Sequence, residues 1–381
     1  MPTSKSLFVT IKATLNCNLA CKYCYGRDNH SAGKEMDDAQ IKKGLKFIND
    51  YAKLANITEL SLCWHGGEPL LFNEKRLETL CEYATDLYTS NGIKCSFSTQ
   101  TNGVLLKQEY YPLLKKYFHG YVGVSLDLFS DFRVFRSGKV STGLIIGNID
   151  KALNAGLKCG AINLITRHNL NRIEDIYNFY KERDMNVRLA RVFPIAENFD
   201  LNNPMYVSDE EFADAMIQYF DLWANDKKPA KNMDIIRLIG DLLLGRPSIC
   251  LRERNCQERY LALSPGGDIY PCAEFDVPES IIGNFLTQKP DEFYKSEIRT
   301  SIFQQAPVPA KCTGCKYETT CYGGCLRERF MVKYPFRCKS NMRYWDHILK
   351  WLESKGASLY ILRGKSREES IKVLSDIFPK A

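Results

Sequence analysis

The sequence contains no apolar run long enough to cross a membrane, and its start, M-P-T-S-K-S, lacks the charged and then apolar regions of a secretion signal. No short repeat or low-complexity tract interrupts the chain. Lysines and arginines are spread along it rather than gathered in one block. We therefore expect no membrane and no nucleic acid among its partners, and a cytoplasmic location.

Cysteine, in contrast, is abundant, and the fifteen cysteines would leave one unpaired in a disulfide-bonded protein. Three of them, Cys17, Cys21 and Cys24, lie in the run C-N-L-A-C-K-Y-C-Y, directly after the predicted strand 7–13. A four-iron cluster normally takes four thiolates, so three on one loop leave one iron open for a small molecule. Zinc is the alternative, with His30 as the one nearby fourth ligand.

The run C-N-L-A-C-K-Y-C-Y resembles the cluster loop of radical S-adenosylmethionine (SAM) enzymes. In that family the open iron holds the amino and carboxylate groups of SAM, and an electron from the reduced cluster cleaves SAM. The resulting 5′-deoxyadenosyl radical then abstracts a hydrogen atom from the substrate. The resemblance implies a [4Fe–4S] cluster on these three cysteines and SAM as cofactor.

A second group of eight cysteines lies in the last third of the chain, in the pattern C-x2-C-x5-C-x3-C between Cys312 and Cys325 with further cysteines on either side. The pattern resembles the SPASM domain, a C-terminal extension of radical SAM enzymes with two auxiliary [4Fe–4S] clusters. By analogy with anaerobic sulfatase-maturing enzymes, two sets are expected, so that the chain would hold three clusters in all: Cys250, Cys256, Cys272 and Cys325; and Cys312, Cys315, Cys321 and Cys338. Zinc on four thiolates is again the alternative.

Predicted strands and helices alternate along the first half of the chain, as in βα units. Six such repeats predict an α/β fold, a partial (β/α)6 barrel like that of radical SAM enzymes, with reactive loops at the carboxyl ends of the strands. We expect the barrel at 1–235, a helical connection at 236–248, a small cysteine-rich SPASM domain with a β-hairpin and helices at 249–345, and a C-terminal helix and tail at 346–381.

Several motifs at the expected strand ends match SAM contacts of the family. The first is H-G-G-E-P, where glycines allow a ligand to approach the backbone closely. On their own, these motifs would read as ordinary turns or core residues. The resemblance implies the following contacts: Tyr23, Gly66, Gly67, Glu68, Asn102, Ser125 and Ile195.

An arginine usually pairs with the SAM carboxylate in this family, because a guanidinium matches a carboxylate in shape and charge. The stretch D-F-R-V-F-R offers Arg133 and Arg136, in a loop that departs from the usual S-x-D-G-P pattern. We favour Arg136.

The sequence departs from the family pattern at the catalytic base. In sulfatase-maturing enzymes an aspartate follows the cysteine matched by Cys272 and acts as the base, whereas this chain has Ala273, which cannot take a proton. Candidate replacements are Asp127, Glu274 and Asp276.

The auxiliary clusters favour oxidation of the substrate, because a fully ligated cluster can accept the second electron. The resemblance implies a peptide or protein substrate. Since Ala273 departs from the sulfatase-maturing pattern, we favour oxidative cross-linking of a ribosomally made precursor peptide, with formylglycine formation in a sulfatase as the alternative. An electron donor such as flavodoxin or ferredoxin is expected. The first strand is predicted to start near residue 7, so leader recognition is either built into the barrel and SPASM surface or supplied by a separate leader-binding protein.

Overall fold

A computed structural model describes residues 5–24, 35–192, 202–248, 250–253, 256–275, 277–332 and 337–377. The chain forms two compact units, each made of two stretches of sequence. The first unit is Met1–Leu164 with Asn255–Gln305, and the second is Ile165–Arg254 with Ala306–Ala381. The predicted domain boundaries, at 235, 248 and 345, stay a prediction. Within the described ranges, no helix is long and apolar enough to cross a membrane.

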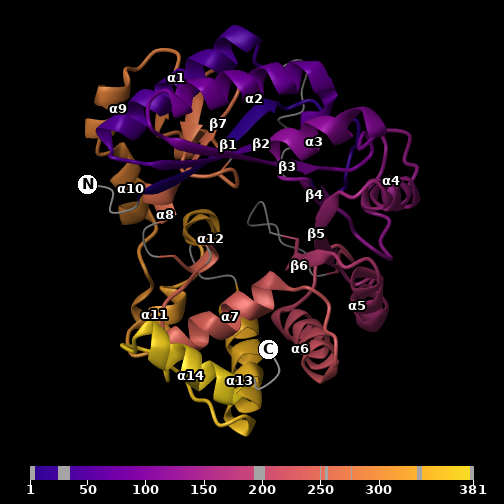
Figure 1. The fold of residues 1–381 in the computed structure, drawn as a ribbon. Coiled ribbons are helices and arrows are strands. Elements are labelled where there is room, and N and C mark those ends of the chain that lie inside the picture. The colour runs from indigo at the N-terminus through magenta and orange to yellow at the C-terminus, as the bar shows by residue number, and fades with distance from the viewer. Residues whose placement is uncertain are drawn as a thin grey trace. The chain divides into compact units, whose positions relative to one another are not determined.

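The strands of the first unit form an open sheet in the order β5-β4-β3-β2-β1-β7-β8-β9 (Figure 1). Strands β1 to β5 and β7 are parallel, whereas the pairs β7–β8 and β8–β9 are antiparallel. The bounds are β1 Ser6–Thr14, β2 Glu59–Gly66, β3 Lys94–Thr101, β4 Tyr121–Ser125, β5 Lys158–Ile165, β7 Tyr260–Leu263, β8 Asp268–Tyr270 and β9 Gly283–Asn284.

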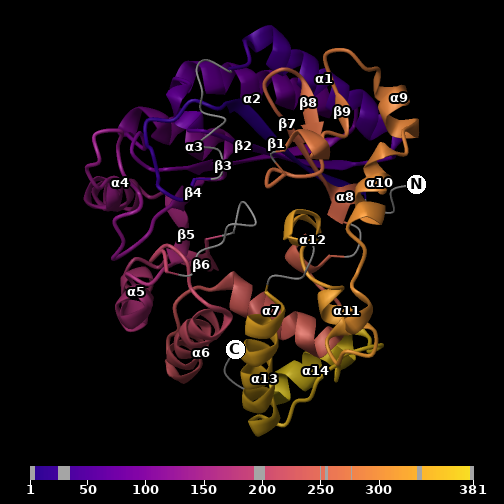
Figure 2. The ribbon, with the colours of Figure 1, turned by 180° about the vertical axis from the view of Figure 1, so that it is seen from behind.

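Helices connect the parallel strands of this unit: α1 Asp38–Leu54, α2 Glu74–Thr89, α3 Tyr111–Tyr117 and α4 Thr142–Asn154. Side chains before two of these helices explain where they begin. Asp37 and Gln40 form a capping box at α1, and Asn73 accepts a hydrogen bond from the Arg76 N–H at α2. Helices α1 and α2 lie on the same side of the sheet in both views (Figure 1, Figure 2). Shorter helices complete the unit: α8 Cys256–Arg259, α9 Pro290–Lys295 and α10 Ile298–Gln305, and the 3-10 turns η2 Pro69–Leu71, η3 Gln108–Tyr110 and η6 Pro278–Ser280.

The two faces of the sheet differ because successive side chains of a strand point to opposite sides. On β2, Leu62 and Trp64 are buried, and Trp64 reaches Cys81 of α2. This apolar face is the one that the helices cover. The residues that alternate with these along β2, such as Ser61 and His65, belong to the other, polar face, as does Lys12 of β1. The polar face therefore supplies the groups for a site.

The hairpin β7–β8 lies on the far side of β1 from β2, since β1 pairs with both β2 and β7. Gly267 in its turn has φ +92°, and a Cβ there would lie 2.5 Å from the Asn284 Oδ1. Only glycine fits this close approach without strain. In the sequence, Gly267 lies between Cys256 and Cys272 in the spacing C-x10-G-x4-C, and the turn gives a structural reason for this glycine.

The second unit contains β6 and mostly helices. Helix α13 packs against α6, where Phe220 contacts the rings of Tyr344, His347 and Trp351. The bounds are η4 Leu170–Arg172, α5 Ile173–Glu182, β6 Asn186–Arg191, α6 Asp209–Asn225, α7 Met233–Leu244, η5 Cys250–Arg252, η7 Ala310–Cys312, α11 Glu318–Cys321, α12 Leu326–Val332, α13 Cys338–Ser354 and α14 Arg367–Ile377.

The predicted fold class is confirmed: the six predicted strand and helix repeats are present as β1–α1 to β6–α6, and the parallel sheet is open. The predicted hairpin of the cysteine-rich part is also present, as β7–β8. The C-terminal part beyond residue 345 contains the rest of α13 and a second helix, α14.

Candidate functional site

A cavity lies at the carboxyl ends of β1 to β4 in the first unit, and the cysteines of the first motif line it. The loops that follow parallel strands gather at one edge of the sheet, so residues far apart in sequence meet there. The lining includes most of the residues singled out in the sequence: Cys17, Cys21, Cys24, Tyr23, Gly66, Gly67, Asn102 and Ser125. It also includes four side chains not favoured from the sequence: Lys12, His65, Gln100 and Arg133.

The cysteine loop is held by backbone hydrogen bonds to a segment 110 residues away. The Ala20 N–H donates to the Val134 carbonyl at 2.7 Å, and the Lys22 N–H donates to the Phe132 carbonyl at 2.8 Å. A turn from Cys21 to Cys24 completes the loop through an N–H to carbonyl bond of 3.1 Å. These bonds fix the loop so that three sulfurs face one cavity, as a cluster with one open iron requires.

Two of these thiols carry raised pKa values, because burial disfavours their charged form. Burial raises the pKa of Cys17 to about 11, although its sulfur accepts the Leu19 N–H at 3.4 Å. Burial also raises the pKa of Cys21, which the Arg133 guanidinium partly counters. Metal binding deprotonates such thiols, so cluster assembly here releases protons. This donor set fits the open four-iron cluster implied by the sequence.

Arg133, and not the favoured Arg136, lines the cavity, so Arg133 is the better placed of the two to pair with the SAM carboxylate. The segment folds back in a hairpin, in which the Phe135 N–H donates to the Lys139 carbonyl at 2.9 Å. Arg136 lies in the turn of this hairpin and is exposed. Arg133 lies in the part that binds the cysteine loop, and its side chain is buried.

Arg133 joins a buried group of three polar side chains. Its guanidinium donates to the Tyr23 hydroxyl at 2.5 Å, its Nε lies 3.3 Å from the Asp127 Oδ2, and its Nη1 lies 3.7 Å from the Cys21 Sγ. Tyr23 also donates to the Asp127 carboxylate. Burial raises the pKa of Tyr23 well above its usual value. The group thus fixes a cation beside the cluster loop.

Asp127 does not fit the role of catalytic base. Its side chain is 1% exposed and does not line the cavity. The Leu164 N–H donates to its Oδ1 at 2.9 Å, while Tyr23 and Arg133 occupy Oδ2. Asp127 therefore positions Arg133 and Tyr23, and a base must reach the proton that it takes.

The two glycines of H-G-G-E-P lie against the start of the cysteine loop. A Cβ on Gly66 would lie 2.1 Å from the Thr14 carbonyl oxygen, and one on Gly67 would lie 2.1 Å from the Asn16 carbonyl oxygen. The Gly67 N–H donates to the Thr14 carbonyl at 2.8 Å. Glycine is thus needed at both positions, and both line the cavity, while their contact with SAM stays a prediction.

Glu68, in contrast, has no exposed surface and does not line the cavity, so it is not placed to contact SAM directly. Its carboxylate accepts three hydrogen bonds: from the Thr101 hydroxyl at 2.6 Å, the Asn102 N–H at 2.7 Å and the Leu70 N–H at 2.9 Å. Burial raises its pKa. Glu68 therefore holds the Q-T-N-G turn after β3.

That turn places Asn102 in the cavity beside the cysteine loop. Its Nδ2 donates to the Asn18 Oδ1 at 2.6 Å and lies 3.5 Å from the Cys17 Sγ, while its Oδ1 accepts the Val104 N–H. On the next strand, the Ser125 hydroxyl accepts a hydrogen bond of 3.0 Å from the Gln100 Nε2. Both predicted residues thus lie at the cavity, with Gln100 as a partner that the sequence alone did not identify.

Lys12 and His65 were also missed, although the sequence contains a signal for each. Lys12 is the one charged residue of the predicted strand L-F-V-T-I-K-A, and His65 directly precedes the glycines. A lysine in a buried strand near a reactive motif is costly to bury and therefore informative.

The other candidate residues are less well placed. The Glu274 side chain is exposed and does not line the cavity. Asp276 and Ile195 lie outside the described residues, as does His30.

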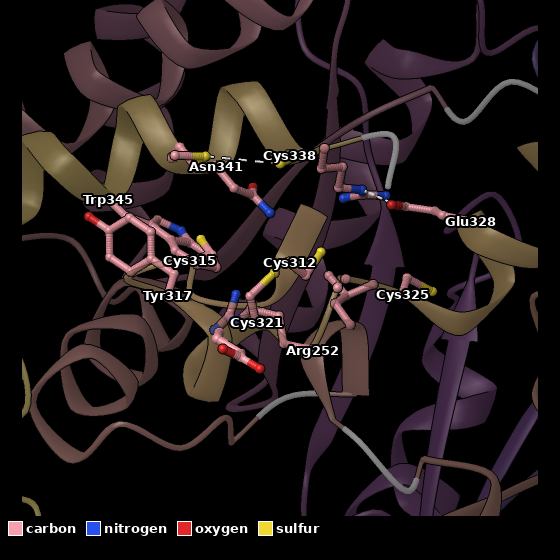
Figure 3. Close-up of a pocket in the computed structure, with 16 residues that line it drawn as sticks. Arg252, Cys312, Cys315, Tyr317, Cys321, Cys325, Glu328, Cys338, Asn341 and Trp345 are labelled. Carbon is pink, nitrogen blue, oxygen red and sulfur yellow. Dashed lines mark hydrogen bonds and ion pairs between the residues drawn. The ribbon is translucent and has the colours of Figure 1, made fainter. Parts of the chain in front are cut away.

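A second cavity, in the second unit, is lined by five cysteines: Cys312, Cys315, Cys321, Cys325 and Cys338. Figure 3 shows them around a space that Arg252, Tyr317 and Trp345 also border. Four of the five are the set expected to hold the second auxiliary cluster. Burial raises the pKa of Cys321 to about 11, and the Arg252 cation partly counters this.

Buried ion pairs flank this second cavity. Arg252 donates to the Asp241 carboxylate at 2.6 Å and lies 5.2 Å from the Trp345 ring centre, with both partners of the ion pair less than 10% exposed. Arg337 pairs with Glu328, which is 2% exposed. Such fixed charges near thiolates tune a bound metal centre.

The set expected to hold the first auxiliary cluster is divided between the two units: Cys256 and Cys272 belong to the first, and Cys250 and Cys325 to the second. Their pairing as one site stays a prediction. Among the described residues, no three His, Cys, Asp or Glu side chains surround one point as ligands of a single metal ion would. The thiolates of a four-iron cluster bind one iron each and so lie farther apart.

Four of the fifteen cysteines belong to none of these sets. Cys63, Cys81 and Cys159 are buried, whereas Cys95 is partly exposed. Burial raises the pKa of all four.

Comparisons with known proteins agree with this site. The profile of the radical SAM superfamily matches residues 11–180, which include the end of β1, the cysteine loop and β2 to β5. A "Serine-type anaerobic sulfatase-maturating enzyme" of Bacteroides thetaiotaomicron is 26% identical over 392 aligned positions, which cover 92% of each chain.

Solved structures show the same fold. "Native anSMEcpe with bound AdoMet and Cp18Cys peptide" has a TM-score of 0.79 at 20% identity, covering 92% of this chain and 98% of its own. Streptococcus suis SuiB, solved "bound to precursor peptide SuiA", has a TM-score of 0.61 at 16% identity, covering 87% of this chain and 74% of its own. The prediction from C-N-L-A-C-K-Y-C-Y is confirmed: the chain is an enzyme that contains a radical SAM domain at residues 11–180, the domain that takes SAM and a [4Fe–4S] cluster.

Proposed function

We propose that this enzyme oxidises a cysteine or serine side chain of a protein substrate to formylglycine, in the manner of an anaerobic sulfatase-maturating enzyme. The observation that carries the proposal is the similarity to the enzyme of that name from Bacteroides thetaiotaomicron, since it covers 92% of both chains and so includes the cysteine-rich C-terminal part. Precursor-peptide cross-linking, favoured from the sequence alone, becomes the second candidate.

Residues of the first cavity have distinct roles in this proposal. With a four-iron cluster bound to Cys17, Cys21 and Cys24, reduction supplies the electron that converts SAM into a hydrogen-abstracting radical. Gly66 and Gly67 let the start of the cysteine loop pack closely against the end of β2, and both line the cavity that would receive SAM. Arg133 offers a guanidinium that matches the SAM carboxylate, and Tyr23 and Asp127 hold it in place.

The second cavity supports the proposal that the enzyme also holds auxiliary clusters. Cys312, Cys315, Cys321 and Cys338 line it together, and four thiolates complete the ligation of a four-iron cluster. A second set of Cys250, Cys256, Cys272 and Cys325 would bring the total to three clusters. Fully ligated clusters would accept the electron that leaves the substrate, and a flavodoxin or ferredoxin would supply the electron that starts the reaction.

The proposal is tested by anaerobic incubation of the reconstituted enzyme with SAM, a reductant and two peptides that span the target site of a sulfatase, one with cysteine and one with serine. We expect an aldehyde in at least one peptide, trapped with a hydrazine and located by mass spectrometry. The Cys21→Ala variant serves as control and should give none. Cleavage of SAM with no aldehyde in either peptide would contradict the proposal.

Ala273 favours the second candidate, because the base of the sulfatase-maturing pattern is absent at that position. In that case the substrate is a ribosomally made precursor peptide that receives a cross-link, with recognition either by this chain or by a separate leader-binding protein. A short open reading frame beside the gene would name the precursor. Loss of a pair of hydrogen atoms from that peptide, without an aldehyde, would support cross-linking over formylglycine formation.

A further inference from the structure

Lys12 and His65 are neighbours near the carboxyl ends of strands β1 and β2. They are direct partners in the register of the parallel strands β1 and β2, and they lie on the polar face. Both line the cavity that the three cluster cysteines line. Two neighbouring side chains that carry N–H groups thus face the space where SAM and the substrate meet.

Hydrogen bonding determines which nitrogen of His65 can act on a ligand. The His65 Nδ1 accepts the Gly66 N–H at 2.8 Å, so in the neutral ring the proton lies on Nε2. Burial and the nearby Lys12 charge lower the pKa of His65 to about 4, so the ring is neutral near pH 7. His65 therefore offers an N–H donor rather than a ready base.

Lys12 supplies a positive charge next to this donor. Its side chain lies on the polar face of the sheet, where the residue is only 2% exposed, and its Nζ lies 5.7 Å from the centre of the Tyr270 ring. Buried lysines are rare unless an anionic or π-electron partner compensates them. An ammonium and an imidazole N–H side by side would bind an anionic atom through charge-assisted hydrogen bonds.

Among the atoms of a cysteine or serine substrate, the thiolate is the anion that such a pair can hold. A free cysteine has a pKa of about 8.5, and a neighbouring cation lowers this pKa into the physiological range. A serine hydroxyl stays protonated under the same conditions and needs a base to remove its proton. The described residues that line the cavity include no carboxylate, and Ala273 stands where the family pattern has an aspartate.

We propose that Lys12 and His65 bind the reacting cysteine of the substrate as a thiolate and so select cysteine over serine. The S–H bond breaks heterolytically when the substrate binds, the proton passes to solvent, and the electron pair stays on sulfur beside the ammonium and the imidazole N–H. No base is then needed during turnover. This inference rests on the proposed function and names the residue on which that function acts.

Other charged groups near this pair bear on its pH dependence. Arg133 at the cavity is paired with Asp127 and Tyr23, and Glu274, after β8, raises the pKa of His65 in opposition to Lys12. Tyr270 faces Lys12 from β8. Lys12 is thus the cation that a bound sulfur would meet on the β1–β2 side of the cavity.

The test measures binding of two small probes, N-acetylcysteine methylamide and N-acetylserine methylamide, to the reconstituted holoenzyme with SAM bound, by anaerobic calorimetry. Below the free thiol pKa, binding as thiolate raises the affinity for the cysteine probe about tenfold for each unit of pH between 6.5 and 7.5. Affinity for the serine probe stays constant over this range. Lys12→Met should lower the cysteine affinity at pH 7.5 by at least about tenfold and remove its pH dependence.

Two further variants make the result specific. Lys12→Arg keeps the charge and should keep the pH dependence, which separates loss of charge from loss of folding. Lys94→Met removes an exposed lysine from the same sheet and should change nothing. Equal affinity for the two probes, no pH dependence, or an unchanged cysteine affinity in Lys12→Met would overturn the proposal.

The peptide experiment separates this inference from the proposed function. Aldehyde formation from the serine peptide at the rate seen with the cysteine peptide would leave the proposed function in place and overturn the cysteine selection. Aldehyde from neither peptide, combined with thiolate binding to the small probes that needs Lys12, would overturn the proposed function and leave the anion site in place.

Discussion

Replacing Arg133 by methionine should destabilise the first unit far more than the same change at Arg136. Arg133 Nε lies 3.3 Å from the Asp127 Oδ2, and the two side chains are 8% and 1% exposed. Removing one partner of such a buried pair costs about 3–5 kcal/mol. Asp127 keeps its bonds from Leu164 and Tyr23, so we expect the lower end, about 3 kcal/mol, for Arg133→Met. Arg136 is exposed, and Arg136→Met should change the free energy of unfolding by less than about 0.5 kcal/mol.

Urea unfolding of the reconstituted protein, followed by tryptophan fluorescence and the visible absorbance of the cluster, measures this difference. With a urea slope of about 3 kcal/mol/M, the Arg133→Met midpoint should fall by about 1 M. Adding Asp127→Asn to Arg133→Met should recover part of the loss, because it removes the uncompensated buried charge. Equal midpoints for the two arginine variants, or a loss below about 1 kcal/mol in Arg133→Met, would refute the reasoning.

Three further predictions follow from buried groups. Glu68→Gln should lower the free energy of unfolding by about 1–3 kcal/mol and make the turn at Asn102 more sensitive to proteolysis, since an amide cannot accept all three hydrogen bonds of the carboxylate. An unchanged digestion pattern would argue against this. Because the pKa of His65 is lowered to about 4 from about 6.5, the folded protein binds fewer protons there than the unfolded chain. Stability should therefore fall by up to about 3 kcal/mol between pH 6.5 and 4, and His65→Gln should reduce that fall; identical pH profiles would contradict it. Arg252→Met should lower the reduction potential of an auxiliary cluster in the second unit, because a buried cation favours the reduced, more negative state of the cluster. Redox titration followed by electron paramagnetic resonance measures this potential. An unchanged potential would count against a cluster beside Cys321.

Elements whose pattern is local could be predicted from the sequence. The strand 7–13 was expected from its β-branched and aromatic residues, and β1 is Ser6–Thr14. The cysteine spacing and the glycines of H-G-G-E-P identified the cavity lining, because those residue types are required by ligation or by close backbone approach. The residues at the centre of the site could therefore be predicted from local sequence motifs.

Side-chain direction could not be predicted in the same way. Arg133 and Arg136 are three residues apart, and only the hydrogen bonds of Ala20 and Lys22 to the segment 132–134 decide which one faces the cavity. Asp127 was predicted as a candidate base and Glu68 as a SAM contact, yet the oxygens of both carboxylates accept hydrogen bonds from backbone and side-chain donors. Lys12 became visible as a site residue only through its register with His65, which depends on how two separate strands pair.

The most direct test of the whole account is to measure 5′-deoxyadenosine and iron content in the Cys17/Cys21/Cys24→Ala triple variant after anaerobic reconstitution, beside the unchanged protein. We expect the unchanged protein to release 5′-deoxyadenosine from SAM when reduced and to hold about twelve irons. The triple variant should keep about eight irons and release none. Release of 5′-deoxyadenosine by the triple variant at the rate of the unchanged protein would contradict the assignment of these cysteines to the SAM-cleaving centre.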